Sequence, residues 1–222
     1  MQTEQHSLRA AAGQRFWQID ALRGLALLNM LVYHAMYDWV YIFGHASSWY
    51  DIWSTHCHVW QQYICWSFIL LSGYSFTLSR RPLKNGLLTA ACAVVLTVAT
   101  AVAMPEEVIW FGVLHLLGVC MMLYPAYKKL PTQELAAMGV VLVVTGYLIS
   151  GTVVEAKFLF PFGFVYEGFA SSDYFPLLPH LGWYMLGTVL GRTVYADKKT
   201  RLPGTFRNLS LIHISEPTRH LR

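Results

Sequence analysis

Long apolar runs, separated by short polar segments, occupy most of the chain, and each run is close to the roughly twenty residues that cross a bilayer as a helix. The runs lie near residues 19–41, 59–78, 86–104, 108–127, 135–154 and 174–195. They predict an all-α membrane protein, a bundle of about six transmembrane helices within residues 19–199. A polar segment, 1–18, precedes the first run, and a basic segment, 200–208, follows the last.

The charges in the connections between the runs alternate in sign. Lysine and arginine gather in the second and fourth connections and around or after the sixth run: Arg80, Arg81, Lys84, Lys128, Lys129, Arg192, Lys198, Lys199, Arg201 and Arg207. Carboxylates prevail in the first, third and fifth connections: Asp51, Glu106, Glu107, Glu155, Glu167 and Asp173, against Lys157. Because cytoplasmic loops carry an excess of lysine and arginine, the pattern predicts that both termini are cytoplasmic.

The first run, IDALRGLALLNMLVYHAMYD, carries ionisable side chains at a depth where they are costly. In one continuous helix, Arg23 and His34 fall about 20° apart on one face and about 16 Å apart along the axis. Asp38 follows His34 at the i+4 position, where a carboxylate can orient the imidazole and raise its basicity. This face therefore predicts a functional site. The structural alternative is that Arg23 extends to the headgroups and His34 makes a hydrogen bond between helices.

Composition supports the membrane interpretation, since 55% of residues are hydrophobic, only 13% are charged and the mean hydropathy is +0.41. A soluble domain has about a quarter of its residues charged. The net charge of +4 comes from clusters between apolar runs, so we expect no nucleic-acid partner. The four cysteines form no disulfide or metal motif, and His56-Cys57-His58 lacks a second ligand pair, so no metal site is expected.

Two connections are rich in aromatic residues. The segment HASSWYDIWSTHCH, residues 45–58, mixes aromatic and polar side chains that suit either the membrane interface or a sugar-like acceptor. In residues 155–179, closely spaced proline and glycine interrupt any helix, and we expect this loop to lie in the interface and cover a cavity. His115, in FGVLHLLGV, faces either the backbone of a neighbouring helix or the same cavity as His34.

Four segments, RFWQIDALRGLALLNMLVYHAMYD, CWSFILLSGYSFTLSR, IWFGVLHLLGV and DYFPLLPHLGWYMLGTVLGR, resemble in this order the bacterial members of the heparan-alpha-glucosaminide N-acetyltransferase catalytic-domain family. The resemblance covers residues 15–199. It implies a transmembrane fold in the bacterial cytoplasmic membrane that passes an acetyl group from cytosolic acetyl-CoA to an acceptor, often a sugar or glycan, on the far side.

The same resemblance suggests two assignments of the site. The Leu-Arg-Gly opening, followed by a histidine, is similar to the wider acyltransferase-three family, in which an arginine and a histidine of the first helix belong to the active site. That similarity selects Arg23 and His34. The animal N-acetyltransferase uses a histidine in a His-Ala-Ser stretch, which here matches His45-Ala46-Ser47. We rank His34 first and His45 second.

The predicted chemistry agrees with these residues. Acyl transfer needs a base for the acceptor or a nucleophile that carries the acyl group, and a histidine oriented by a carboxylate can do either. A cytoplasm-facing Arg23 can pair with the phosphates of acetyl-CoA. Two other classes stay open: a small-molecule transporter, which would favour inverted repeats and broken helices, and a non-catalytic membrane partner protein.

The last segment, 209–222, departs from the basic composition before it. Its wording, LSLIHISEPTR, resembles the translation of a sequencing-library adapter. We therefore expect the authentic chain to end near Asn208 as a truncated fragment, with further hydrophobic sequence in its relatives. His213 and His220 are excluded from any site on this interpretation.

Overall fold

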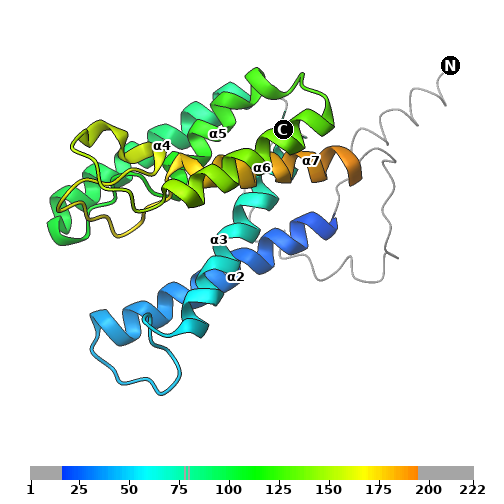
Figure 1. Ribbon diagram of the computed structural model, residues 1–222. Coiled ribbons are helices and arrows are strands. Elements are labelled where there is room, and N and C mark those ends of the chain that lie inside the picture. Colours follow the sequence, from blue (N-terminus) through cyan, green and yellow to red (C-terminus); the bar gives the residue numbers. More distant parts are fainter. Residues whose placement is uncertain (1–16, 78, 80, 195–222) are drawn as a thin grey trace, which may run out of the picture. The chain divides into compact units, whose positions relative to one another are not determined.

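The computed structural model describes residues 17–77, 79 and 81–194, and within them the protein is helical (Figure 1). The α-helices are α2 (Trp17–Tyr37), α3 (Thr55–Phe76), α4 (Pro82–Ala103), α5 (Val113–Tyr127), α6 (Thr132–Ile149) and α7 (Leu177–Val194). A π-helix, η1 (Asp38–Ile42), follows α2, and two 3-10 turns, η2 (Pro105–Glu107) and η3 (Lys157–Phe162), lie in the connections. The predicted all-α class is confirmed.

Each of the six apolar runs contains a helix, but several boundaries differ from the prediction, and three of the differences have a local cause. The fourth run starts its helix at Val113 instead of residue 108, because the preceding residues are extended and pair with the segment before α7. The fifth helix ends at Ile149, before Gly151, whose φ of 78° no ordinary helix residue adopts. The sixth begins at Leu177, after Pro176. Among the described helices, α4 and α6 are long and apolar enough to cross a membrane.

The chain forms two compact units, and α3 contributes its first half to one and its second half to the other. The described part of the first unit is residues 17–64, which hold α2, the π-helix and the following loop. The described part of the second unit is residues 65–194, which hold the rest of α3 and the antiparallel pairs α4–α5 and α6–α7. Six spans and cytoplasmic termini stay predictions.

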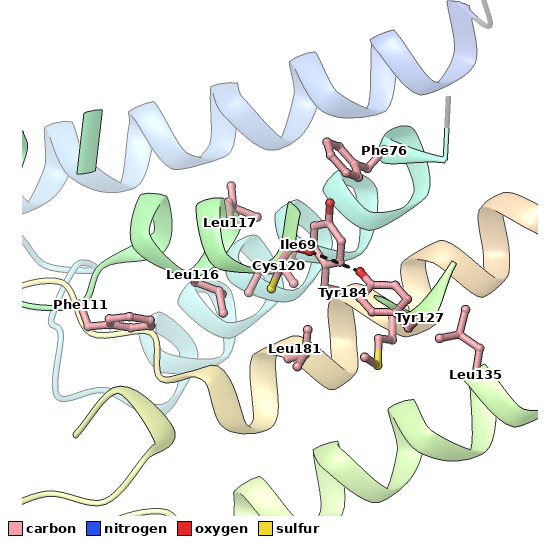
Figure 2. Close-up of a cluster of buried hydrophobic side chains, with 11 residues drawn as sticks. Ile69, Phe76, Phe111, Leu116, Leu117, Cys120, Tyr127, Leu135, Leu181 and Tyr184 are labelled. Atoms are coloured by element: carbon pink, nitrogen blue, oxygen red, sulfur yellow. Dashed lines mark hydrogen bonds between the residues drawn. The ribbon is translucent and has the colours of Figure 1, made fainter. Parts of the chain in front are cut away.

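The core of the second unit lies where α3, α5, α6 and α7 meet (Figure 2). Tyr184 and Leu116 are fully buried in it, as is the single buried polar side chain among the described residues, Thr188, which donates to the carbonyl of Tyr184. The cluster comprises Ile69, Phe76, Phe111, Leu116, Leu117, Cys120, Tyr127, Leu135, Leu181, Tyr184 and Met185. These contacts hold residues 65–194 together as one body.

The outer surfaces of α4 and α6 are apolar, whereas their packed faces are lined with small residues. Val102 of α4 and Leu148 of α6 are about four-fifths exposed, at 79% and 80%. The buried positions of the same helices include Gly86 and Ala93 on α4 and Gly146 on α6. Large apolar groups outside and small ones inside are typical of helices that pack together in lipid. This arrangement supports the membrane assignment independently of hydropathy.

The connections after α4 and before α7 lie against each other at one end of the second unit. Phe175 N–H donates to the carbonyl of Phe111 at 2.8 Å, and Trp110 N–H donates to Ser171 Oγ at 3.1 Å. Aromatic side chains of the loop between α6 and α7 hold that loop together. Tyr174 Oη donates to the carbonyl of Phe160 at 2.6 Å. Burial of that hydroxyl raises the pKa of Tyr174 to about 12. The loop is therefore ordered and lies over the first turns of α5 and α7, and its place in the membrane interface over a cavity stays a prediction.

Candidate functional site

The helix α2 is continuous from Trp17 to Tyr37, so the geometry worked out for the first run applies to it. Arg23 and His34 lie on one face, about 20° apart and about 16 Å apart along the axis. Both side chains are exposed in the described structure. The ring of His34 makes an edge contact with Tyr33, with ring centroids 6.3 Å apart. This face offers a cation at one level and an imidazole two to three turns further along.

Asp38 does not continue the α-helix, because the backbone changes to a π-helix at that residue. Within residues 17–77, no side-chain hydrogen bond or ion pair joins His34 to Asp38, although α-helical spacing predicts that they meet. A π-turn widens the helix, so the side chains that follow Asp38 leave the α-helical register. Such turns are frequent at functional sites, and no residue type in the sequence marks this one.

The π-helix brings the His-Ala-Ser stretch back against the end of α2. Phe43 N–H donates to the carbonyl of Asp38 at 2.8 Å, and His45 N–H donates to the carbonyl of Trp39 at 3.1 Å. Between them Gly44 has a φ of 70°, which permits the chain to reverse there. The ring of His45 then stacks on the indole of Trp39, with centroids 3.9 Å apart. Two contacts thus fix where the His45 ring lies.

A wide-open surface cavity of about 440 Å³ lies beside His45, a volume in the range of small-molecule sites. Its lining combines residues of the helix end and of the loop: Met36, Trp39, Ala46, Ser47, Ser48 and Trp49. His45 stacks on one of these residues and directly precedes another. By contrast, His34 is two residues before Met36, about 200° around the helix, so it faces away from the cavity.

The loop that carries the cavity wall is held by a buried tyrosine. Tyr50 is only 2% exposed, and its hydroxyl donates to the carbonyl of Tyr33 at 3.4 Å. Burial is the main reason why the pKa of Tyr50 is raised above its usual range. Its ring also packs edge-on against Tyr33, which in turn contacts Trp60 of α3. The buried ring anchors the loop to α2 and α3.

A second anchor is the carboxylate of Asp51. It accepts hydrogen bonds from Tyr41 Oη at 3.3 Å and from Trp53 N–H at 3.0 Å, and so ties the loop to the end of the π-helix. His56 Nε2 lies 2.5 Å from the carbonyl of Trp49 and holds the same turn. In the part of the chain that the structure describes, no group of three histidine, cysteine or acidic side chains lies close enough to bind a metal.

His115 of α5 makes hydrogen bonds with both ring nitrogens. Nδ1 accepts from the N–H of Gly112 at 3.2 Å, which leaves the proton of the neutral ring on Nε2. Nε2 lies 3.2 Å from Thr97 Oγ1, whose own hydrogen is given to the carbonyl of Ile109 at 2.6 Å. Nε2 therefore donates to Thr97. This geometry supports a structural role for His115, whose ring joins α4 and α5 to the connection between them, over a role in a cavity shared with His34.

Asp173 caps the start of α5 from a distant part of the chain. Its Oδ2 accepts the N–H of Val113 at 2.9 Å, one of the N–H groups that a helix start leaves without a partner. Gly112 has to lack a side chain there, because a Cβ at this position would lie 2.1 Å from the same oxygen. Sequence spacing could not reveal this contact across sixty residues.

The family assignment rests on comparison of the whole sequence. The sequence model of the family described as "Heparan-alpha-glucosaminide N-acetyltransferase, catalytic" matches residues 15–217. The chain belongs to this family. The family is one of membrane-associated acetyltransferases that use acetyl-CoA. No curated protein and no solved structure matches the chain.

The matched range contains every candidate residue of this N-acetyltransferase family member, from Arg23 through His34, Asp38 and His45 to His115. It also runs past Asn208 into the segment 209–222. That segment lies outside the described residues, and its adapter origin stays a prediction.

Proposed function

We propose that this family member transfers the acetyl group of acetyl-CoA to a hydroxyl or amine acceptor, a sugar or glycan on the outer side of the bacterial cytoplasmic membrane. The family match supports the acetyl transfer. The apolar surfaces of α4 and α6 support a chain that crosses the bilayer. On this proposal the protein is multi-pass, with acetyl-CoA arriving from the cytoplasm.

The cavity beside His45 is the observation that carries the assignment of the acceptor site. It has room for a small molecule, and its lining offers the Ser47 and Ser48 segment for hydrogen bonds and two tryptophans for the apolar face of a ring. This cavity favours His45 over His34 as the residue nearest the acceptor, which reverses the order suggested by the sequence.

In the proposed reaction, the imidazole of His45 accepts a proton from the acceptor, either from its hydroxyl group or from its amino group. The freed lone pair attacks the carbonyl carbon of the acetyl thioester, a bond to that carbon forms, and the carbon–sulfur bond breaks. The thiolate of coenzyme A leaves and takes up a proton. Stacking on Trp39 holds the ring in place, and this reduces the entropy lost on reaching the transition state.

Arg23 and His34 form the second part of the proposal. Their shared face on α2 places Arg23 and His34 about 16 Å apart along the helix axis, which suits a phosphate-bearing donor that lies along the helix. His34 is the alternative base or acyl carrier, with Asp38 as its proposed orienting partner. Kinetic measurements can separate these roles. Loss of Arg23 is expected to weaken acetyl-CoA binding, whereas loss of a histidine is expected to lower the rate.

The test is acetyl transfer by the purified chain in liposomes. Radiolabelled acetyl-CoA is supplied on one side and a panel of amino sugars and neutral sugars on the other, and acetylated acceptor is measured. We expect His45→Ala to lower the rate by roughly 10²–10⁴-fold, as loss of a general base does. Arg23→Ala should raise the acetyl-CoA concentration needed for half-maximal rate.

His58→Ala is the matched control, because His58 is an exposed histidine of the same unit and its side chain makes no hydrogen bond within residues 17–77. It should retain the parent rate at equal expression. If His34→Ala is inactive while His45→Ala is not, the transfer site moves to the Arg23 face. Movement of unmodified sugar across the liposome without acetylation would instead support a transporter and refute the proposed reaction.

A further inference from the structure

The open cavity beside His45 offers a ligand hydrogen-bond donors and no negative charge. Its lining consists of one methionine, one alanine, two serines and two tryptophans: Met36, Trp39, Ala46, Ser47, Ser48 and Trp49. None of these described residues is aspartate, glutamate, lysine or arginine. The charge of the acceptor is therefore a property on which this site can select.

The polar groups of the lining are mainly free to donate. Ser47 Oγ accepts the N–H of Tyr50 at 3.1 Å, so the hydrogen of this hydroxyl remains for a ligand. The indole N–H groups of Trp39 and Trp49 donate only, and each of these side chains is half exposed. Donors of this kind complement a ligand that is rich in lone pairs, such as the hydroxyl and ether oxygens of a sugar.

Two carboxylates occur in the segments beside the cavity, and neither belongs to its lining. Asp38 lies two residues after Met36, about 160° around the helix, so it points away from the lining. The Asp51 carboxylate accepts from Tyr41 Oη at 3.3 Å and from Trp53 N–H at 3.0 Å, which holds it at the end of the π-helix. A protonated amine would therefore find no counter-charge in the lining.

The tryptophans could attract a cation, but this attraction is small here. The ring of His45 covers one face of Trp39, and Trp60 lies beside Trp49 with ring centroids 6.1 Å apart. An exposed cation–π pair contributes only about 0.5–1 kcal/mol. An ammonium group has donors and no acceptor, so it gains little from lining groups that also donate. A hydroxyl group is uncharged and can accept from them.

We propose that the acceptor in this cavity is a hydroxyl group of an uncharged sugar, so that the product is an acetyl ester and not an amide. The acceptor oxygen forms the bond to the acetyl carbon, the carbon–sulfur bond breaks, and the hydroxyl proton passes through His45 to the thiolate of coenzyme A. Ser47 and Ser48 donate to other oxygens of the sugar. This inference rests on the proposed function. The family is described as one of N-acetyltransferases, so an ester product would distinguish this chain within it.

The experiment compares two acceptors that differ at one position, methyl glucoside and the methyl glycoside of glucosamine, with radiolabelled acetyl-CoA and the full chain in liposomes. At about pH 6 a sugar amine, like an α-amino group, is almost fully protonated, and so it does not take an acetyl group from a neighbouring ester. We expect kcat/KM to be about fivefold higher for the glucoside. Alkaline hydroxylamine, which cleaves esters and spares amides, should release the label from the products of both acceptors. Liposomes without protein give the uncatalysed background.

Ser48→Asp tests the charge argument directly, with Ser48→Asn as the matched uncharged variant of the same size. The added carboxylate supplies the counter-charge that the lining lacks. The kcat/KM for the glucosamine glycoside relative to the glucoside should therefore be about two- to fivefold higher in Ser48→Asp than in Ser48→Asn, the range of an exposed ion pair. If the aspartate variant does not fold, the products and the acceptor ratio of the parent chain decide the question.

Three results would overturn the inference while leaving acetyl transfer itself intact. They are a hydroxylamine-stable amide as the main product, a kcat/KM for the glucosamine glycoside at pH 6 that equals or exceeds that of the glucoside, and the same ratio in Ser48→Asp as in Ser48→Asn. If neither these acceptors nor the wider panel of sugars is acetylated, the proposed function is refuted, and this inference with it.

Discussion

The close contact between α3 and α7 makes a quantitative prediction about two glycines. A Cβ on Gly73 would lie 2.1 Å from the backbone oxygen of Tyr184, and a Cβ on Gly187 would lie 2.2 Å from that of Leu70. Ordinary contacts are at least 3.4 Å, so Gly73→Ala requires a movement of about 1.3 Å between the helices. The atom in the way is backbone and cannot rotate aside.

The cost follows from two opposing terms. Overpacking a closely fitted contact costs about 1–3 kcal/mol, and a gap of up to about 1 Å around the displaced helix forfeits a quarter to a half of the affected dispersion energy. The higher helix propensity of alanine stabilises the helix by about 1 kcal/mol relative to glycine, which offsets part of this cost. We therefore expect Gly73→Ala and Gly187→Ala each to lower the free energy of unfolding by about 2 kcal/mol.

Gly139 of α6 is the matched control. A Cβ there would meet the Gly182 backbone oxygen and the Leu186 side chain at 3.2 Å, a misfit of only 0.2 Å that a small shift of the backbone and a movement of the leucine can relieve. The helix-propensity gain should then dominate, so Gly139→Ala is expected to be neutral or to stabilise by up to about 1 kcal/mol.

Thermal unfolding in detergent, followed by tryptophan fluorescence, measures these differences. Trp66 of α3 and Trp183 of α7 stack with ring centroids 5.4 Å apart, so their emission reports directly on the contact. If Gly73→Ala unfolds at the parent temperature, or if Gly139→Ala is the more damaging change, the backbone contact between α3 and α7 is not as described.

Three further predictions follow from single contacts. Thr97→Val should destabilise by about 1 kcal/mol in thermal unfolding, since it leaves a partly buried carbonyl and the imidazole beside it without this hydroxyl, whereas Thr193→Val, whose hydroxyl bonds only its own helix, should be nearly neutral. Asp173→Ala should cost about 1 kcal/mol and speed proteolysis of the preceding loop, because the start of α5 loses its cap. A membrane-impermeant thiol reagent should label cysteine introduced at Asp51 in intact cells but not cysteine at Lys84, in a background without native cysteines, and the reverse pattern would contradict the predicted orientation.

Sequence alone determined the class of the protein and the position of its helices. The apolar runs are long relative to any polar interruption, so the sequence predicts a helix in each of them without help from tertiary contacts. Helix geometry also predicted that Arg23 and His34 share one face, because residues eleven positions apart in a regular α-helix point in nearly the same direction.

Residues near the ends of the helices were harder to place from sequence. The fourth run was apolar from residue 108 onward, yet its first five residues pair with the segment before α7 and are extended. Hydropathy cannot distinguish an apolar helix from an apolar extended segment, because both bury the same side chains. The backbone partner that decides between them, Phe175, lies more than sixty residues away.

Only the tertiary structure distinguished among the histidines. All three candidates, His34, His45 and His115, sit in similar aromatic surroundings along the sequence. The π-helix and the turn after it brought His45 onto Trp39 beside a cavity, while hydrogen bonds to Gly112 and Thr97 occupied both nitrogens of His115. A side chain's chemistry is set by its residue type, but what it can react with depends on which distant groups the fold places next to it.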